Sequence, residues 1–207
     1  MGGEKTEKQK SILVTGGGGF LGKAIVRMLL EKGHEVTSLS RNFHGVLEDM
    51  GVSQICGDIA DAKTVEKAVR DRDVVFHTAA RAGVWGEFDL YFNTNVLGTR
   101  NVLSACRLCR TPMLIHTSSP SVVFDGSDME GVDESAPYPN HFHAPYPETK
   151  AMAEQEVKAA AKEGIATIIL RPHLIWGPED NHLVPRILAR ADSLRQIGNG
   201  SNKVDTI

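Results

Sequence analysis

Residues 12–22 of this chain read ILVTGGGGFLG, a short apolar run followed by four successive glycines and the start of an amphipathic segment. The apolar run favours a buried strand, and the segment that begins at Leu21 has the apolar spacing of a helix. The glycines satisfy two overlapping patterns, G-x-G-x-x-G from Gly17 and T-G-x-x-G-x-x-G from Thr15. Glycine at these points allows a tight turn, lets a pyrophosphate approach the backbone and lets the helix pack closely on the strand. The stretch therefore predicts the phosphate-binding turn of a dinucleotide-binding fold.

The first turn of the helix after the glycines supports the same prediction. Its N–H groups have no partner within the helix, and together with the helix dipole they attract a phosphate. The residues expected to contact the cofactor here are Gly16, Gly19, Phe20, Leu21 and Gly22. No Lys-Ser or Lys-Thr follows the glycines, which argues against a P-loop nucleoside triphosphatase. The alternative is a glycine-rich turn that binds no ligand.

The rest of the chain alternates short apolar runs with longer amphipathic segments. Strands are expected at residues 12–15, 35–39, 52–56, 74–77, 113–117 and 166–170, and helices at residues 21–32, 62–69, 96–109 and 147–163. The strands are nearly continuously apolar, as in parallel strands that are covered on both faces. The alternation predicts an α/β fold with a doubly wound parallel sheet. Residues 125–147 contain four prolines and are expected to form a long loop.

Composition narrows the class of protein. The chain has 207 residues, 41% of them hydrophobic, and a net charge of −3, which argues against a nucleic-acid-binding protein. No apolar run approaches the ~20 residues that span a bilayer, and the polar N-terminus lacks the apolar stretch of a signal peptide. Three cysteines do not make a disulfide framework. A cytoplasmic protein without a membrane span is expected.

The end of the second strand bears on the choice of cofactor. A carboxylate at this point would bind the adenosine ribose of NAD, but here the strand ends Ser38-Leu39-Ser40-Arg41. A small hydroxyl followed by a guanidinium fits a 2′-phosphate, so Ser40 and Arg41 favour NADP(H), with NAD(H) left open. The alternative is that Arg41 is an ordinary solvated charge. Further cofactor contacts are expected after the third and fourth strands, from Asp58, Ile59, Ala79 and Ala80.

Tyr146 and Lys150 are the candidates for the chemistry. They are four residues apart at the start of a helix, so they lie on one helix face. A lysine ammonium beside a phenol is expected to lower the pKa of the tyrosine, which could then donate a proton to a carbonyl oxygen. This spacing is common by chance, but Thr117-Ser118-Ser119 at the end of the fifth strand strengthens the interpretation.

Seven motifs in order resemble the extended short-chain dehydrogenase/reductase superfamily, a family of Rossmann-fold enzymes. They are TGGGGFLG at 15–22, GDIAD at 57–61, FHTAA at 76–80, NVLGT at 95–99, HTSS at 116–119, YPETK at 146–150 and RPHLIWGP at 171–178. The resemblance implies that Ser119 binds the carbonyl, that Tyr146 donates the proton, and that Lys150 assists Tyr146 and holds the nicotinamide ribose. It also implies cofactor contacts by Asn95, Pro172, His173, Tyr146 and Lys150.

Three stretches narrow the resemblance: AARAGVWG at 79–86, TSSPSVVF at 117–124 and RPHLIWGPEDNHLVPRI at 171–187. They look most like the 3β-hydroxysteroid dehydrogenase branch of the superfamily and bacterial reductases of β-keto acids. The resemblance implies an NADP(H)-dependent enzyme that interconverts a ketone and a secondary alcohol, on a β-keto or β-hydroxy acid or a sterol-like substrate. Members continue well beyond the point at which this chain stops, so the C-terminal substrate-binding part is expected to be largely absent. The expected divisions are a polar arm at 1–10, an NAD(P)-binding Rossmann domain at 11–178 and the start of a truncated substrate-binding region at 179–207.

Other functions remain as alternatives. A nucleotide-sugar epimerase or dehydratase would use the same residues on a retained NAD, although no acid pair follows Ser119 as a dehydratase usually needs. A catalytically silent cofactor-binding scaffold is a third interpretation, and a homodimer is left open. Cys106 and Cys109 form a C-x-x-C near a helix C-terminus, where packing is a better explanation than redox or zinc chemistry. No metal site is expected, from the His141 and His143 pair or elsewhere.

Overall fold

Six parallel strands form one sheet in the computed structural model, which describes residues 8–83, 85–180, 183–195, 199–201 and 203. The strands are β1 (Ser11–Thr15), β2 (Glu35–Ser40), β3 (Ser53–Cys56), β4 (Val74–His77), β5 (Met113–Thr117) and β6 (Ala166–Leu170). Their spatial order is β3-β2-β1-β4-β5-β6, so the chain reverses direction across the sheet between β3 and β4. This is the strand order of the Rossmann fold, and the predicted fold class is confirmed.

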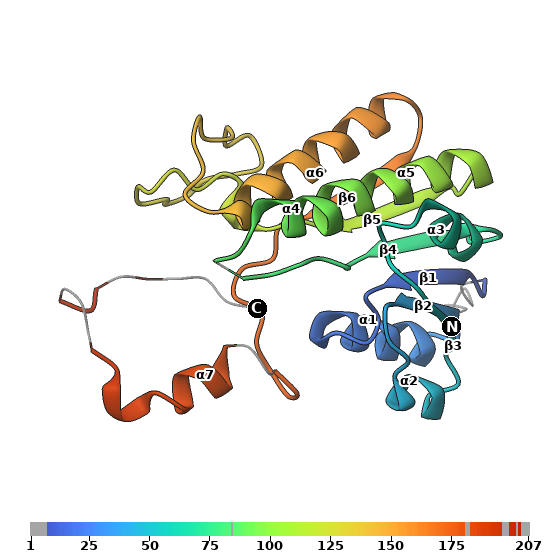
Figure 1. The fold of residues 1–207 in the computed structure, drawn as a ribbon, viewed down its shortest axis with the longest axis horizontal. Coiled ribbons are helices and arrows are strands. Elements are labelled where there is room, and N and C mark those ends of the chain that lie inside the picture. Colours follow the sequence, from blue (N-terminus) through green and yellow to red (C-terminus); the bar gives the residue numbers. More distant parts are fainter. Residues whose placement is uncertain (1–7, 84, 181–182, 196–198, 202, 204–207) are drawn as a thin grey trace, which may run out of the picture.

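Helices cover both faces of the sheet (Figure 1). They are α1 (Phe20–Glu31), α2 (Gly45–Asp49), α3 (Ala62–Val69), α4 (Phe88–Tyr91), α5 (Gly98–Cys109), α6 (Pro145–Lys162) and α7 (Val184–Leu188). The α3, α5 and α6 helices pack on one face around Leu13, Val75 and Leu114, and α1 and α2 pack on the other around Val14. None of the helices in the described part of the chain has the length and apolar character needed to span a membrane.

The expectation that every strand is covered on both faces is wrong for β6. Ile168 and Leu170 are 44% and 49% exposed, whereas Ile169 between them packs against the core under α5 and α6. Ile168 is in register with Ile115, which packs on the α1 side of the sheet. The exposed residues of β6 therefore face the α1 side, and they are exposed because α1 and α2 cover the opposite half of the sheet (Figure 1).

Two helix starts differ from the expected bounds. The helix expected at 96–109 is preceded by α4 and by a π-helical segment, Phe92–Leu97, that runs directly into α5. The α6 helix begins at Pro145, two residues before the expected start, because proline suits the first turn of a helix. The expected long loop is present between β5 and α6, and only the short 3-10 helix Pro120–Val122 interrupts that connection. Residues 1–7 of the expected N-terminal arm lie outside the described residues.

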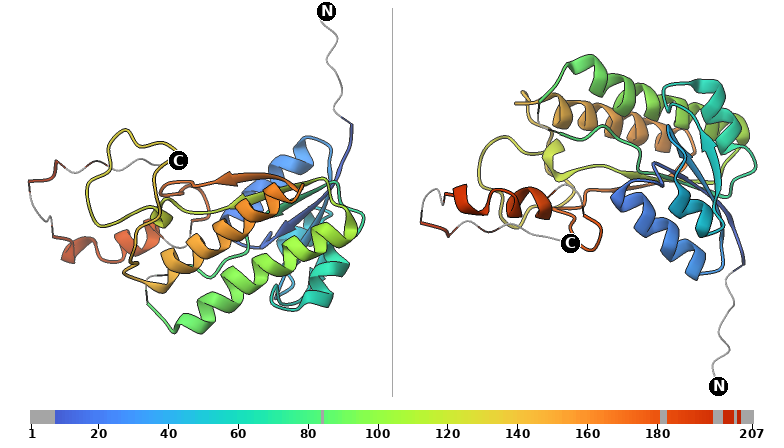
Figure 2. Two further views of the ribbon diagram at one scale, coloured as in Figure 1. Left: turned by 90° about the horizontal axis from the view of Figure 1, so that it is seen from above. Right: turned by 60° about the horizontal axis from the view of Figure 1, so that its bottom comes forward.

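The loop before α6 and the segment containing α7 project from the same end of the molecule, beyond the carboxyl ends of the strands (Figure 2). In open α/β sheets, ligands bind at this end, near the point where the strand order reverses. The expected division at residue 178 falls between β6 and α7, and it stays a prediction.

A buried imidazole lies where β1, β4 and α5 meet. His77 Nδ1 is 2.8 Å from the Thr15 hydroxyl, and His77 Nε2 is 2.9 Å from the Thr99 hydroxyl. Thr99 donates its own proton to the Asn95 carbonyl at 2.6 Å, so it accepts from Nε2–H, and Nδ1 is left to accept from Thr15. Burial, reinforced by the positive charge of Lys150, lowers the pKa of His77 from 6.5 to about 3, so the imidazole is neutral.

This imidazole makes the folded state sensitive to acid. Below pH 6.5 the unfolded chain binds a proton at residue 77, whereas the folded chain leaves His77 neutral until about pH 3. Stability should therefore fall as the pH drops, and at pH 5.5 His77 alone should contribute a loss of about 1.4 kcal/mol. Urea unfolding at pH 7.5 and 5.5, on the wild type and on His77→Gln, measures this. The variant should lose less stability between the two pH values, and an equal loss would contradict the assignment.

Candidate functional site

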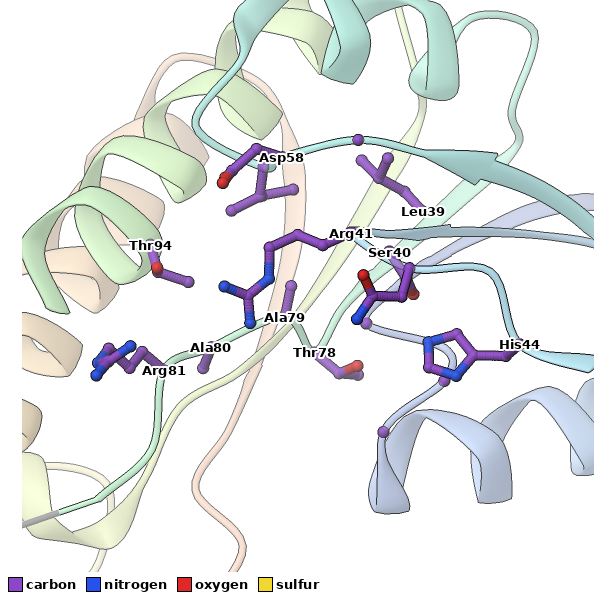
Figure 3. A pocket seen from close by; sticks show the side chains of 16 residues that line it. Leu39, Ser40, Arg41, His44, Asp58, Thr78, Ala79, Ala80, Arg81 and Thr94 are labelled. Atoms are coloured by element: carbon purple, nitrogen blue, oxygen red, sulfur yellow. The ribbon is translucent and has the colours of Figure 1, made fainter. Parts of the chain in front are cut away.

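A cavity of about 320 Å³ opens at the carboxyl ends of β1 to β4 (Figure 3). Eight of the predicted cofactor residues line it: Gly16, Gly19, Ser40, Arg41, Asp58, Ile59, Ala79 and Ala80. The other predicted cofactor residues lie outside its lining: Phe20, Leu21, Gly22, Asn95, Tyr146, Lys150, Pro172 and His173. The segments after four strands thus converge on one cavity, and contact of these residues with a cofactor stays a prediction.

The glycine turn forms the floor of this cavity. Gly16 has a φ of +74°, and a Cβ there would lie 3.0 Å from the Ala79 backbone. Its N–H donates to the Leu39 carbonyl at 2.7 Å, and its own carbonyl accepts from the Gly19 N–H at 2.9 Å. A Cβ on Gly22 would lie 2.1 Å from the Gly16 carbonyl oxygen, so this glycine is what allows α1 to lie against the turn.

The start of α1 suits a phosphate. Gly19 caps the helix without a side-chain hydrogen bond, and the first turn contains no acidic residue. The Gly18 and Gly19 backbone thus lines the cavity at the positive end of the helix dipole, and no carboxylate of the first turn competes there for an anion. A bare glycine backbone beside a helix N-terminus fits the pyrophosphate of a dinucleotide.

Basic and polar side chains surround the part of the cavity next to β2. The Arg41 side chain is exposed and reaches across the opening (Figure 3). His44 also lines the cavity, and a Cβ on Gly18 would lie 2.1 Å from its Nε2, so the imidazole covers the turn. Asp58 uses one carboxylate oxygen to accept the Ala60 N–H at 2.9 Å. Sequence reasoning missed His44, because only the folded loop brings it beside the glycines.

Ser119 and Tyr146 meet beyond the end of β5. Ser119 is buried, and its hydroxyl lies 2.8 Å from the Ser121 hydroxyl. Burial raises the pKa of Tyr146, and the nearby Ser119 hydroxyl opposes that rise. The expected lowering of the tyrosine pKa is therefore wrong for this structure, because burial outweighs the stabilisation of the phenolate. Tyr146 keeps its proton at neutral pH.

Lys150 is a buried cation one helical turn after Tyr146. The residue is 3% exposed, and its Nζ donates to the Thr117 carbonyl at 2.5 Å. Burial lowers the pKa of Lys150 from 10.5 to about 8, and the negative charge of Glu154 acts in the opposite direction. The lysine thus remains mainly charged at neutral pH, and it loses that charge in mildly alkaline solution.

Asn95 joins the cavity to the helix that carries Tyr146. Its side-chain oxygen accepts from the Arg81 N–H at 2.8 Å, and its Nδ2 donates to the Arg81 carbonyl at 3.2 Å. The same Nδ2 donates to the Thr149 hydroxyl at 3.0 Å. Asn95 lies in the π-helical segment, whose extra residue per turn is a frequent feature of functional sites. Sequence reasoning found Asn95 but missed Thr149.

A second cavity, of about 470 Å³, is lined by the residues directly after Ser119, beginning with Pro120 and Ser121. Ser121, which hydrogen-bonds to Ser119, lines this cavity together with the predicted residue His173. Apolar side chains from the long loop supply much of its wall: Phe124, Met129 and Val132. Ser119 therefore adjoins the second cavity through Ser121, and Asn95 links the helix of Tyr146 to Arg81 in the lining of the first cavity.

The cysteine pair and the histidine pair noted in the sequence do not form a further site in the described part of the chain. Cys106 is buried in α5, and burial raises its thiol pKa to about 12, which suits packing and opposes redox chemistry. Among the described residues, no three His, Cys, Asp or Glu side chains are grouped as a metal site would require. The His141 and His143 rings contact each other edge to face.

Residues 13–207 match the model of the 3-beta hydroxysteroid dehydrogenase/isomerase family. A 2-alkyl-3-oxoalkanoate reductase from Stenotrophomonas maltophilia is 51% identical over 199 residues, which are 94% of this chain and 60% of that protein. A sterol-4-alpha-carboxylate 3-dehydrogenase (decarboxylating) from Mus musculus is 36% identical over 96% of this chain and 56% of its own length. The chain thus spans between half and two thirds of the length of these relatives.

Solved structures share the fold. A UDP-N-acetylglucosamine 4-epimerase from Methanobrevibacter ruminantium superposes with a TM-score of 0.82 at 27% identity, over 97% of this chain and 69% of that one. The UDP-glucose 4-epimerase of Thermus thermophilus, solved with NAD, gives a TM-score of 0.75 at 32% identity, over 86% of this chain and 60% of that one. Epimerases and dehydrogenases thus share this architecture, so the fold alone does not distinguish the two reactions.

Gly22 offers a test of the packing between the turn and α1. Gly22→Ala would place a Cβ 2.1 Å from a backbone oxygen, so α1 must shift, and the free energy of unfolding should fall by about 1–3 kcal/mol. Gly45→Ala is the matched control, because a Cβ there meets nothing within 4 Å in the first turn of α2. Urea unfolding should give a wild-type or slightly higher stability for the control. Equal stabilities of the two variants would contradict the described packing.

Proposed function

The chain belongs to the 3-beta hydroxysteroid dehydrogenase/isomerase family, and from that premise we propose that it is a nicotinamide-dependent oxidoreductase that interconverts a ketone and a secondary alcohol. The observation that carries the proposal is the group formed by Ser119, Tyr146 and Lys150, on a helix that Asn95 connects to the lining of the first cavity. Residues 11–178 are the cofactor-binding domain in this proposal, and residues 179–207 begin the substrate-binding region.

The proposed cofactor is NADP(H). The glycine turn and the first turn of α1 hold the pyrophosphate, and Ala79 and Ala80 line the path along the end of β4. Ser40 and Arg41 bind the adenosine 2′-phosphate, because β2 ends in a hydroxyl and a guanidinium where an NAD-binding strand has a carboxylate. Lys150, Asn95, Pro172 and His173 belong to the nicotinamide end. When bound, the dinucleotide would supply the hydride.

The proposed catalytic residues act on the carbonyl oxygen. Tyr146, protonated at neutral pH, donates its proton to that oxygen as the alkoxide forms. The Ser119 hydroxyl binds the same oxygen and keeps the tyrosine hydroxyl in place. The buried charge of Lys150 favours the phenolate that remains after proton transfer. In alcohol oxidation the same residues act in reverse.

The proposed substrate is a β-keto acid or its β-hydroxy acid, with a sterol-like alcohol as the second choice. The relative at 51% identity is named for the reduction of 2-alkyl-3-oxoalkanoates. The second cavity supports an alkyl substituent, because Phe124, Met129 and Val132 present apolar surface beside Ser121. A nucleotide-sugar epimerase is the rival candidate, since proteins of that activity superpose well on the chain. Incubation with NADPH and a β-keto acid, or with a nucleotide sugar, separates the two activities.

Removal of one hydroxyl tests the assignment of the proton donor. Tyr146→Phe should retain the fold and NADPH affinity, because the ring remains and the glycine turn holds most of the cofactor. The rate of ketone reduction in the full-length protein should fall by about 10²–10⁴, the usual contribution of a positioned general acid. NADPH consumption, followed at its own absorbance band, measures this rate. Retention of most of the activity would overturn the mechanism.

Arg41 tests the cofactor preference. Arg41→Ala should weaken NADPH binding about 10- to 100-fold through loss of charged hydrogen bonds to phosphate, and should change NADH binding little. Arg81→Ala is the control, because Arg81 lines the same cavity beside Asn95 and should affect both cofactors equally. Fluorescence titration of each variant with each cofactor gives the four affinities. Tighter binding of NADH than of NADPH by the wild type would overturn the preference.

A further inference from the structure

Glu154 is a fully buried carboxylate that the proposed mechanism does not use. It lies in α6, one helical turn after Lys150 and two turns after Tyr146, and its relative exposure is 0%. An ionised carboxylate in such a place is costly unless other groups pair with it. The groups that pair with Glu154 must therefore compensate the cost of burying its charge beside the proposed active site.

Four side chains from four segments converge on this carboxylate. Ser118 at the end of β5 donates at 2.5 Å, and Tyr138 of the long loop donates at 2.8 Å. Arg171, just after β6, donates through Nη2 at 2.6 Å and through Nε at 3.1 Å. Lys158 pairs with it from the next turn of α6 at 3.1 Å. These donors outweigh burial and lower the pKa of Glu154 to about 2, so the carboxylate is charged at any ordinary pH.

We propose that Glu154 is a positioning residue for the proposed active site, which fixes Ser118 against α6 and places a counter-charge one turn below Lys150. The proposal rests on the proposed function, because it assigns Glu154 a role toward Ser119 and Lys150. It adds a residue that touches neither the substrate nor the cofactor in the mechanism above.

The first half of this role concerns the end of β5. The Ser118 N–H donates to the Leu170 carbonyl at 2.6 Å, and its hydroxyl donates to Glu154. Ser118 is thus held by β6 on one side and by α6 on the other. Ser119 follows directly, and its hydroxyl is near enough to the Tyr146 phenol to lower the pKa of that phenol. Fixing Ser118 therefore fixes the backbone from which the Ser119 hydroxyl reaches the tyrosine.

The second half concerns the charge on Lys150. The titratable groups that act on this lysine are Glu154 in α6, His77 in β4 and His116 in β5. Burial keeps both histidines neutral, since it lowers the pKa of each. Glu154 is therefore the charge that favours the ammonium form, against the burial that disfavours it. Loss of this carboxylate should let Lys150 deprotonate at a lower pH.

Two variants separate this role from plain structural support. Glu154→Gln removes the charge and keeps the side-chain shape, whereas Tyr138→Phe removes one hydrogen bond of the same network without a change of charge. Nitrogen-15 NMR of the lysine side chains, with the Lys150 signal assigned through Lys150→Arg, follows the titration in each full-length protein. The Lys150 midpoint should move down by about one pH unit in Glu154→Gln, the order expected for loss of a neighbouring opposite charge. It should stay in place in Tyr138→Phe.

Activity gives the second readout. In Glu154→Gln the alkaline limb of the kcat/KM profile should move down with the lysine midpoint, so the loss should be about fivefold at pH 8 and close to none at pH 6. Equal Lys150 midpoints in the two variants would overturn the inference, even where the wild type reduces ketones. A wild type with no ketone reduction would overturn the proposed function, and the NMR titration would still decide the role of Glu154.

A third variant covers the case in which Glu154→Gln does not fold, as judged by circular dichroism. Ser118→Ala removes one donor and leaves the carboxylate paired with Tyr138, Arg171 and Lys158. The proposal expects at least a tenfold lower kcat with NADPH affinity within threefold of the wild type, because Ser119 loses its anchor. Wild-type kcat in Ser118→Ala would overturn the positioning role.

Discussion

The neutral imidazole of His77 connects the parts of the molecule that the site depends on. Through the Thr15 hydroxyl it touches the strand that leads into the glycine turn, and through Thr99 it reaches the Asn95 carbonyl. The Asn95 side chain in turn donates to the hydroxyl of Thr149, the residue before Lys150. One chain of hydrogen bonds thus runs from β1 to α6. A histidine can donate with one nitrogen and accept with the other only when it is neutral. Burial keeps His77 neutral, and it therefore preserves both of these hydrogen bonds.

The site is built from two regions that are held differently. The cavity at the carboxyl ends of β1 to β4 has a floor of glycine backbone, and close approaches at Gly16 and Gly22 leave no room for side chains in that turn. The region around Ser119 and Tyr146 depends on buried polar side chains, with the Glu154 carboxylate at its centre. The π-helical segment that carries Asn95 lies between them. A dinucleotide needs a fixed surface along its length, whereas proton transfer needs control of charge at one atom.

The features that could be predicted from the sequence are those set by local patterns of residues. The bounds of the strands and the glycine turn follow from short-range spacing, and the shared face of Tyr146 and Lys150 follows from helix geometry. The role of Glu154 could not be predicted in this way, because its partners come from β5, the long loop and the end of β6. The raised pKa of Tyr146 depends equally on burial that no spacing reveals. The exposed face of β6 was missed because an apolar run looks the same whether one or both of its faces are covered.

The open face of β6 affects how the chain behaves at high concentration. Ile168 and Leu170 present an apolar strip, and β6 is the last strand of the sheet in the described part of the chain. Apolar strips on terminal strands promote association between copies. The molecular mass measured by light scattering on a purified sample would therefore include association through this strip as well as any native oligomer. Replacing Ile168 by lysine would separate the two contributions, because a charge on the strip opposes adhesion without entering either cavity.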